Sequence, residues 1–422
     1  MCLTALFISM EDVKMETRKY ESPLGRDIGT SKATKGSGWK GLKGQMALAL
    51  AVSLWIGSSG FASADGLLYL KVDNNDELRQ NGEIPAGATV SNSGKTLTIT
   101  EGASWNSWVF NGGRADSSAV EGYTLNLSGV KGTFSAEGGN TNSNTVSGNT
   151  VEGTNIETNG AIRGGISHNN QASSNTVLLK NSTVGSVYGS DGSTGANNSS
   201  VTLENTTVNE SVYGGRTYTG TAIAIGNTVT LKNSTITNYI YGGYNMNSAT
   251  DLVTGNTLNL SGANTAGAVQ NFATINLKAA EWGKPVLTLS GTGIMQNKDG
   301  SYATIDTRGI AFSGVNALST GQNTILIKNK MTGYTGEILS GKYKVGSTLE
   351  GLGTASLSGD DLIYTIDTGV SMTAQEQTHN TVMGAEVGMA ALSAGNDFVG
   401  AATEGLSMAG NTGTGFNFHE GQ

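Results

Sequence analysis

The sequence predicts an all-β fold, a right-handed parallel β-helix in which each turn of the coil, or rung, takes about 24–29 residues. One observation behind this prediction is a repeat of that length in the middle of the chain. A second is the alternation of apolar and polar residues within each copy, which is the period of a strand. A third is composition, because glycine makes up 62 of the 422 residues while charged residues reach only 14%. Such a composition suits many short strands joined by tight turns.

The repeat is clearest between residues 149 and 270, where copies such as NTVLLKNSTVGSVYGS and NTVTLKNSTITNYIYGGYN follow one another. A unit of this size cannot bury its apolar face alone, so neighbouring units should stack in register. Parallel crossovers are overwhelmingly right-handed, which gives the hand of the coil. The leading apolar residues of successive copies are spaced 26, 24, 28 and 29 residues apart: Val151, Val177, Val201, Val229 and Leu258.

Stacked rungs should align equivalent side chains in ladders along the axis, because neighbouring strands lie about 4.8 Å apart. The leading apolar residues form the ladder that faces inward. Opposite charges alternate in an outward ladder made by Lys180, Glu204 and Lys232. At the strand end, where an amide can bond the turn backbone above and below, the expected ladder is Asn181, Asn205 and Asn233.

A Val-Tyr-Gly or Ile-Tyr-Gly corner follows the second short strand of each copy, and most variation in length falls after it. The corner tyrosines should stack rung on rung, and an exposed aromatic stripe is a candidate contact for a glycan or a protein. The simpler interpretation is that these rings cover the rung edge, because the glycines after them suggest a tight bend that needs a lid. The residues of this candidate stripe are Tyr188, Tyr213, Tyr241 and Tyr244.

Residues 1–64 are typical of an extended signal peptide. Two lysines precede a short apolar run at residues 46–57, and the small residues of Ala62-Ser63-Ala64 follow it. A basic flank, an apolar core and a small-x-small site describe a secretory signal, so we expect cleavage between Ala64 and Asp65. An apolar run of 12 residues is too short to span a bilayer. Because the leader is unusually long, Met10 and Met15 are alternative starts.

Three further regions follow the leader. Residues 65–140 are strand-rich without a clean repeat and are expected to cap the first rung, with the pattern SWNSWVFNGG exposed. Residues 141–370 are expected to form the solenoid. Over residues 371–422 alanine, methionine and glutamate replace threonine and asparagine, which favours a short helical segment. Without the leader the chain keeps 17 basic and 28 acidic residues, a balance that disfavours nucleic acid and anionic lipid as partners.

The order of leader, Gly/Asn/Thr-rich solenoid and closing segment THNTVMGAEVGMAALSAGNDFVGAATEGL makes the chain resemble the passenger of a Gram-negative autotransporter. The closing segment is similar to the stretch just ahead of the outer-membrane barrel in that family. The resemblance implies type V secretion, display at the outer membrane and cell surface, and a role as an adhesin or structural surface protein without catalysis. Its implied partners are a translocator barrel and a glycan or protein on a host or bacterial surface.

The chain departs from that family in one respect, since no barrel precedes its last residue, Gln422. A barrel needs many strands of about ten residues with alternating polarity, and nothing after Gly410 could supply them. We therefore expect a truncated or frame-interrupted product, or one half of a split system. The expressed chain itself is then expected in the periplasm or the medium.

Polysaccharide lyases and hydrolases also use parallel β-helices, and a secreted enzyme of this kind is the alternative function. Their acid, base or calcium chemistry needs clustered carboxylates. Between residues 117 and 298 the only aspartates are Asp191 and Asp251, both expected at the variable edge. Asp360 and Asp361 should point to opposite faces of a strand. The sequence therefore assigns no catalytic residue, no metal and no cofactor.

Other candidate sites are weaker. The segment YGSDGST, residues 188–194, is similar to a protease nucleophile motif, but its Ser and Asp stand in the wrong order and a turn is expected there. Glu204, Glu210 and Arg216 could line a cleft, although solvated faces explain them more simply. His168 is expected in a loop, without a second ligand at metal spacing. A fibre or tailspike-like module is a third alternative, and the leader argues against it.

Overall fold

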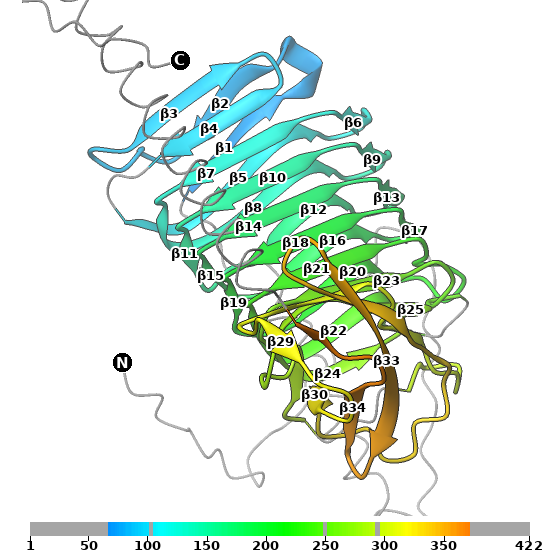
Figure 1. Cartoon of the computed structure of the whole chain (residues 1–422). Coiled ribbons are helices and arrows are strands. Elements are labelled where there is room, and N and C mark those ends of the chain that lie inside the picture. The colour runs from blue at the N-terminus through cyan, green and yellow to red at the C-terminus, as the bar shows by residue number, and fades with distance from the viewer. Residues whose placement is uncertain (1–65, 101–103, 248–250, 292–295, 372–422) are drawn as a thin grey trace, which may run out of the picture. The chain divides into compact units, whose positions relative to one another are not determined.

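The structure, a computed structural model, describes residues 66–100, 104–247, 251–291 and 296–371. Within these residues the protein is a β-solenoid of about eight turns whose strands stack in parallel (Figure 1). The predicted fold class is thereby confirmed, while the hand of the coil stays a prediction. The expected signal peptide, with its cleavage site at Ala64 and Asp65, lies outside the described residues. So does the expected C-terminal helix, apart from Ser371.

The first side of the solenoid is a stack of short parallel strands in constant register, apart from one shift after Leu260. Val177, for example, lies opposite Val151 on one neighbour and Val201 on the other. Side chains alternate between inside and outside along each strand, so one register holds the apolar set inward. The strands of this side are β4 (Thr96–Thr100), β7 (Thr124–Ser128), β10 (Thr150–Thr154), β14 (Thr176–Lys180), β18 (Ser200–Glu204), β21 (Thr228–Lys232), β23 (Thr257–Ser261), β25 (Thr274–Glu281), β27 (Thr304–Asp306) and β31 (Ile338–Leu339).

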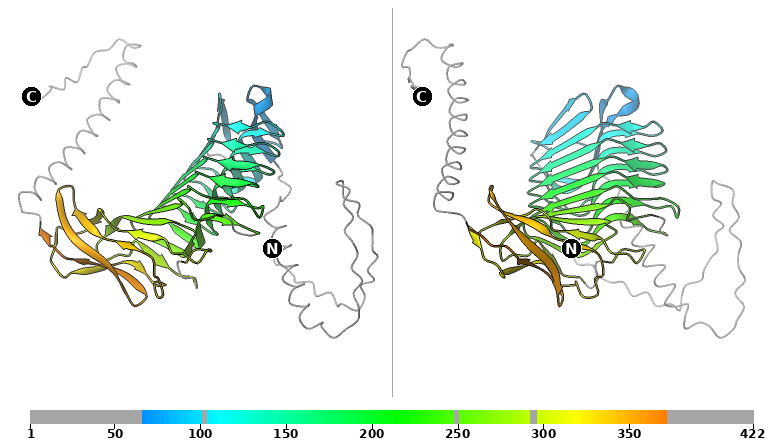
Figure 2. Two further views of the ribbon diagram at one scale, coloured as in Figure 1. Left: turned by 90° about the vertical axis from the view of Figure 1, so that its right-hand side faces the viewer. Right: turned by 45° about the vertical axis from the view of Figure 1, so that its right-hand side comes forward.

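The second and third sides follow each first-side strand, and Figure 2 shows how these strands continue the stack. In three rungs one long strand serves both sides: β5 (Trp105–Ala115), β8 (Lys131–Thr141) and β22 (Thr235–Asn245). In the rungs between them a break separates the two sides. The second-side strands there are β11 (Glu157–Thr158), β15 (Thr183–Val184) and β19 (Thr207–Val208), and the third-side strands are β12 (Ile162–Ser167), β16 (Val187–Gly192) and β20 (Val212–Thr217).

A fourth side closes the earlier rungs with a separate small parallel sheet. It consists of β6 (Val120–Glu121), β9 (Val146–Ser147), β13 (Gln171–Ser173) and β17 (Gly195–Asn197). After the rung of β22 the stack continues through β24 (Asn264–Gln270), β26 (Leu287–Leu289), β28 (Ile310–Ser313) and β30 (Asn323–Lys328).

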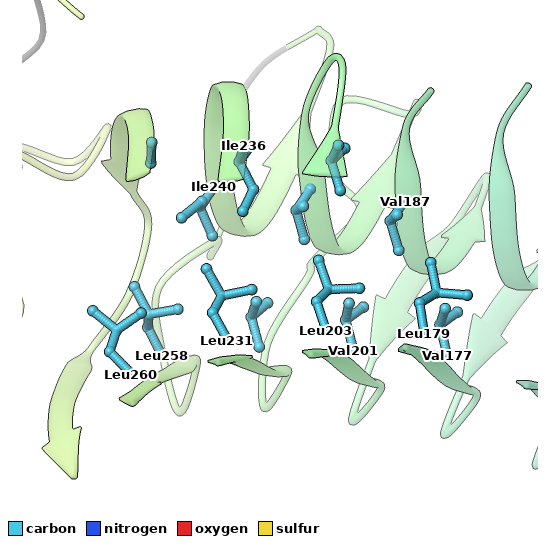
Figure 3. Packing of buried hydrophobic residues seen from close by; sticks show 14 of the residues in the cluster. Val177, Leu179, Val187, Val201, Leu203, Leu231, Ile236, Ile240, Leu258 and Leu260 are labelled. Atoms are coloured by element: carbon cyan, nitrogen blue, oxygen red, sulfur yellow. The ribbon is translucent and has the colours of Figure 1, made fainter. Parts of the chain in front are cut away.

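The inward ladder predicted from the repeat is confirmed. Val177, Val201, Val229 and Leu258 are all 0% exposed and lie in register. Figure 3 shows Leu179, Leu203 and Leu231 in this inward ladder, with Ile236 and Ile240 of β22 facing it from the opposite side of the coil. The core is therefore one continuous set of apolar columns, in which each rung packs chiefly against its two neighbours.

The outward ladder of alternating charge is also confirmed. Glu204 lies between two lysines on adjacent rungs, with Oε2 3.4 Å from Lys180 Nζ and Oε1 2.8 Å from Lys232 Nζ. Both lysine side chains are about half exposed. Exposed ion pairs of this kind contribute little to the free energy of unfolding. The ladder therefore favours the observed register by placing opposite charges beside one another, without adding much stability.

The corner asparagines occupy the strand end as expected, but their backbone explains them better than their amides do. Asn181, Asn205 and Asn233 have φ values of 51°, 49° and 50°. Asparagine is one of the few residues besides glycine that tolerates this left-handed conformation. The amide hydrogen bonds are fewer than expected: Asn205 Nδ2 donates to Asn181 Oδ1 over 3.1 Å, and the backbone N–H of Ala263 donates to Asn233 Oδ1 over 3.0 Å.

The solenoid begins earlier than the expected cap boundary at residue 140, because β4 already pairs in parallel with β7. The cap is shorter: β3 (Thr89–Ser93) pairs antiparallel with β4, while β1 (Gly66–Lys71) lies beside β5 and pairs antiparallel with β2 (Glu77–Asn81). A 3₁₀ turn, η1 (Val72–Asn74), follows β1. Mostly polar, exposed residues on β2 and β3 suit strands at an open sheet edge.

The pattern SWNSWVFNGG, expected to be exposed, is instead largely inside. Trp105 is 0% and Trp108 5% exposed, and their rings meet edge to face with centroids 4.9 Å apart. Phe110 packs against both. The expectation failed because these rings fill the interior between β8 and the single capping strand β1, whose Leu68 and Leu70 are also buried.

The other end of the described solenoid closes with antiparallel strands. β33 (Leu349–Ser358) pairs with β32 (Gly341–Val345) through its first half and with β34 (Asp361–Ile366) through its second. β34 also pairs with β30, and β29 (Ala317–Leu318) pairs with β35 (Val370–Ser371). Folding strands back in this way gives the last parallel strands hydrogen-bond partners. In the described part of the chain no helix has the length and apolar character needed to cross a membrane.

Candidate functional site

The outward face of the third side carries two columns of side chains, one on each flank of a pair of small residues. Together we call these columns the outer strip. Register partners of the first column are Asn111, Glu137, Arg163, Tyr188, Tyr213, Tyr241 and Gln270. Register partners of the second column are Arg114, Asn140, Ile166, Asp191, Arg216 and Tyr244.

The small residues between the columns are required by close backbone approach. A Cβ atom on Gly189 would lie 2.4 Å from the carbonyl oxygen of Gly214, and one on Gly214 would lie 2.5 Å from that of Gly242. These glycines lie within strands rather than in a turn. The expected tight corner after each tyrosine is therefore wrong, and the repeated glycines instead let successive rungs pack backbone to backbone.

The predicted stacking of the tyrosines is confirmed. The rings of Tyr188 and Tyr213 are 4.7 Å apart and nearly parallel, at 1°, and those of Tyr213 and Tyr241 are 5.3 Å apart at 14°. Tyr244 packs against Tyr213 edge to face. Tyr188 and Tyr241 are only 6% and 9% exposed. The rings face one another along the axis and expose little surface, which fits the simpler interpretation that they cover the rung edge.

Asp191 lies at the centre of the strip and is fully buried. Its carboxylate accepts hydrogen bonds from Arg216 Nε at 2.9 Å and Nη2 at 2.5 Å, and from Arg163 Nε at 3.2 Å. The hydroxyl of Tyr218 donates to the same carboxylate. Two arginines from the rungs on either side thus hold one carboxylate, and the bidentate contact of Arg216 is the strong form of such a pair.

Glu137 extends the network toward the N-terminal rungs. It accepts from Asn111 Nδ2 at 2.7 Å and Asn140 Nδ2 at 2.6 Å, and it lies 3.3 Å from Arg163 Nη1. The guanidinium of Arg216 also stacks on the ring of Tyr188, 4.2 Å from its centroid. The charges and the aromatic stack therefore form one connected cluster across several rungs.

The electrostatics follow from this pairing. Burial alone would raise the pKa of Asp191, but the charges of Arg216 and Arg163, with their hydrogen bonds and that of Tyr218, hold it below its ordinary value of 3.8. Burial raises the pKa of Tyr218, and the neighbouring Asp191 raises it further. Asp191 is therefore an anion held in place, not a group poised to exchange protons near neutral pH.

We expect this pairing to make stability sensitive to acid. The unfolded carboxyl takes up a proton near pH 3.8 and the folded one only at a lower pH, so protons favour the unfolded state over that interval. The stabilisation is complete above about pH 5 and declines as the pH falls toward the lowered pKa. Urea midpoints of the wild type and of Asp191→Asn, compared from neutral to acid pH, should converge. Parallel profiles would contradict the assignment.

The residues of the outer strip that sequence reasoning missed share a recognisable sequence pattern. Asn111, Glu137 and Arg163 each follow an apolar residue and precede Gly-Gly, as Tyr213 does in VYGG. Aligning the glycine pairs rather than the tyrosines would have placed all of them in one column.

A second ladder runs inside the coil, at the first residue of each copy. The backbone N–H of each member except the last donates to the side-chain oxygen on the next rung, over 3.0 Å from Asn149 to Asn175 and 2.8 Å from Asn227 to Asn256. The amides also reach the fourth side, as where Asn227 Nδ2 donates to the carbonyl of Ala196. The members are 0–1% exposed: Asn149, Asn175, Ser199, Asn227 and Asn256. The ladder gives hydrogen-bond partners to buried backbone N–H groups that would otherwise have none.

One rung departs from this pattern at two facing positions, and the two differences compensate for each other. Where other rungs have asparagine against glycine, this rung has Ser199 against Ser190, with their hydroxyl oxygens 2.6 Å apart. In the neighbouring rung a Cβ on Gly215 would lie only 2.8 Å from Asn227 Nδ2. An asparagine in the inner ladder therefore requires glycine at the position that faces it, and a larger residue at that position requires a shorter side chain in the ladder.

We expect Ser199→Asn and Ser190→Gly each to destabilise the protein, and the double variant to recover part of the loss. The first change alone crowds Ser190, at a cost of about 1–3 kcal/mol. The second alone removes a hydroxyl that accepts from Asn175 Nδ2. Together they restore the arrangement of the other rungs, so urea midpoints should give a coupling of about 1 kcal/mol or more. Additive effects would show that the two positions are independent.

The segment YGSDGST is not the expected turn. Residues 187–192 form β16, all buried, and only the last two residues of the motif lie in a bend. Ser190 and Asp191 are engaged in the contacts described above, and Asp191 does not lie at the variable edge. His168 follows β12 at a bend and is partly buried.

The acidic candidates are held apart. Glu204 pairs with its two lysines, Glu210 accepts from the hydroxyl of Ser186, and Arg216 pairs with Asp191. Asp360 and Asp361 bond to the segment at residues 329–332: Asp360 to the hydroxyl of Thr332, Asp361 to the backbone N–H of Asn329. Among the described residues no group of three or more His, Cys, Asp or Glu side chains could hold a metal ion.

Comparisons with protein-family models, curated proteins and solved structures gave no match to this chain.

Proposed function

We propose that this protein is an exported solenoid of the autotransporter-passenger type that acts as an adhesin or structural surface protein, without catalysis. The observation that carries the proposal is the state of the outer strip. Its central carboxylate, Asp191, is fully buried and bonded by two arginines and a tyrosine. A general acid or base must instead be able to exchange a proton with a bound substrate.

The regular outer surface supports a binding role. Short ladders of polar and charged side chains line the first side, as where Thr202 and Thr230 are register partners on adjacent rungs. Beside the buried tyrosines, Tyr239 is 40% exposed and stacks on Tyr241 with centroids 5.1 Å apart. The free face of this ring at the end of the stack is our proposed contact for a surface glycan or protein, since exposed aromatic faces suit such ligands.

The proposal can be tested against the secreted-enzyme alternative. Folded protein spanning residues 65–422 is incubated with a panel of polysaccharides, and separately coated on beads that are exposed to host cells or glycan arrays. We expect no new reducing ends or unsaturated products, and adhesion that falls several-fold in Tyr239→Ser. Tyr213→Phe, at a partly buried ring inside the stack, is the matched control and should adhere like the wild type. Product formation would favour the enzyme, and absent adhesion would leave only a structural role.

Export itself makes a separate prediction. Cleavage after Ala64 should give a mature chain that begins at Asp65, because small residues at 62 and 64 follow the apolar run. The intact mass of the protein from the periplasm or medium measures this directly. An exported chain that keeps residues 1–64 would contradict the signal-peptide assignment.

A further inference from the structure

Three tripeptides at one corner of the solenoid match the acceptor sequence for asparagine-linked sugars, Asn-x-Ser/Thr. They are Asn181-Ser182-Thr183, Asn205-Thr206-Thr207 and Asn233-Ser234-Thr235. The structure places them on three successive rungs, because Lys180, Glu204 and Lys232 just before them are register partners. The corner itself requires only a residue that tolerates positive φ, and Asn155, followed by Ile and Glu, occupies it on the preceding rung.

The fold uses the middle residue of each triplet and leaves the other two to the outside. Ser182, Thr206 and Ser234 are 1–4% exposed, and each hydroxyl donates to a carbonyl two residues earlier. The outer hydroxyls of Thr183, Thr207 and Thr235 have no hydrogen-bond partner in the described part of the chain. The asparagines that carry the amide are exposed, and the threonines that carry the outer hydroxyl are half-buried at Thr183 and Thr207 and exposed at Thr235.

The outer hydroxyl is not needed by the fold. Lys131 and Glu157 occupy the position of Thr183 on the two preceding rungs, in the same parallel ladder. A charged side chain thus serves as well there, so the fold does not require the outer hydroxyl. Threonine also continues this ladder on the next two rungs, at Thr265 and Thr288, where no asparagine stands two residues earlier.

The three amides are not equivalent. Asn205 Nδ2 donates to Asn181 Oδ1 over 3.1 Å. Asn181 and Asn233 use only their oxygens in hydrogen bonds with described residues, so their nitrogens are free there. These two residues are two rungs apart, about 10 Å along the axis. That spacing leaves room for a sugar on each, whereas a sugar on the middle asparagine would crowd both neighbours.

We propose that Asn181 and Asn233 are sites of N-linked glycosylation on the folded protein, with Asn205 between them unmodified. In the reaction the amide Nδ2 forms a bond to the anomeric carbon of a sugar activated as a diphosphate ester. The bond from that carbon to the leaving phosphate oxygen breaks, and the amide proton passes to a base on the transferase. This inference goes beyond the proposed function and does not depend on adhesion.

The test is a peptide map of the protein purified from the cells that naturally produce it. Peptides that contain Asn181 and Asn233 should carry a sugar mass increment, while those with Asn205 and Asn155 should have their sequence masses. Unmodified peptides at Asn181 and Asn233 would overturn the proposal. Equal modification of all three asparagines would also overturn it, since it would show attachment before folding, without selection by the Asn205 hydrogen bond.

Variants produced in the same cells separate recognition from folding. Thr183→Val keeps the β-branched shape but removes the hydroxyl, so the increment at Asn181 should be lost while that at Asn233 remains as an internal control. Thr183→Ser should restore it. Persistence of the sugar at Asn181 in Thr183→Val, with an unchanged urea midpoint, would show that the acceptor sequence is not being recognised.

Discussion

Val229→Asp should destabilise the solenoid by more than about 4 kcal/mol, the largest effect of any single change considered. Val229 is fully buried, in register between Val201 and Leu258, and its neighbours offer no polar partner from their side chains. A carboxylate there must either remain charged in an apolar column or take up a proton and stay without hydrogen bonds. The urea midpoint of the purified protein measures the loss.

Thr230→Asp is the matched control, because it introduces the same group at the next residue of the same strand. Thr230 faces outward in the ladder between Thr202 and Asn259. We expect a midpoint close to that of the wild type, and the same for Lys232→Ala on that face. Equal losses at Val229 and Thr230 would contradict the register of β21.

Asp191→Ala should cost about 3–5 kcal/mol, because it leaves two buried arginines without their shared carboxylate. The side chains of Arg163 and Arg216 are only 12% and 13% exposed, so water can replace little of what they lose. Circular dichroism followed through urea unfolding would measure the change. Replacing Arg216 by methionine in the Asp191→Ala background should recover part of the loss, since Arg163 keeps Glu137 as its partner and no unpaired charge then remains.

Glu204→Ala supplies the matched control for Asp191. Each acid bridges two cations on the rungs to either side, but Glu204 and its lysines lie at the surface, where water and salt screen the charges. We therefore expect no resolvable shift of the midpoint for Glu204→Ala. Similar losses for the two variants would show that burial does not decide the strength of these bridges.

Much of the fold was predictable because its signals are local and repeated. The spacing of Val177, Val201 and Val229, with alternation inside each copy, determines strands, stacking and the inward ladder. The ends were not predictable in the same way. The tryptophans of SWNSWVFNGG look exposed in an alternating pattern, but the end of a coil needs large apolar side chains that no repeat specifies.

The candidate site likewise has a part that could be predicted from the repeat and a part that could not. The stacking of Tyr188, Tyr213 and Tyr241 follows from the repeat alone. The pairing of Asp191 with Arg163 and Arg216 does not, because their spacing in the sequence follows from rung lengths and carries no charge pattern. The composition of YGSDGST is typical of a turn, whereas its glycines, Gly189 and Gly192, are required by close backbone approach.

The sequence by itself determined the β-solenoid, its inward apolar ladder, its outward Lys180–Glu204–Lys232 ladder and the stacking of the tyrosines, because each depends only on a period and on neighbours one repeat away. The tertiary structure alone decided burial: that Asp191 is enclosed while Glu204 is not, that Trp105 lies inside, and that Ser199 is compensated by Ser190. These outcomes depend on how far apart the sides of the coil lie and on which faces meet. Such distances are set by the whole packed rung, and no residue pattern along the chain encodes them locally.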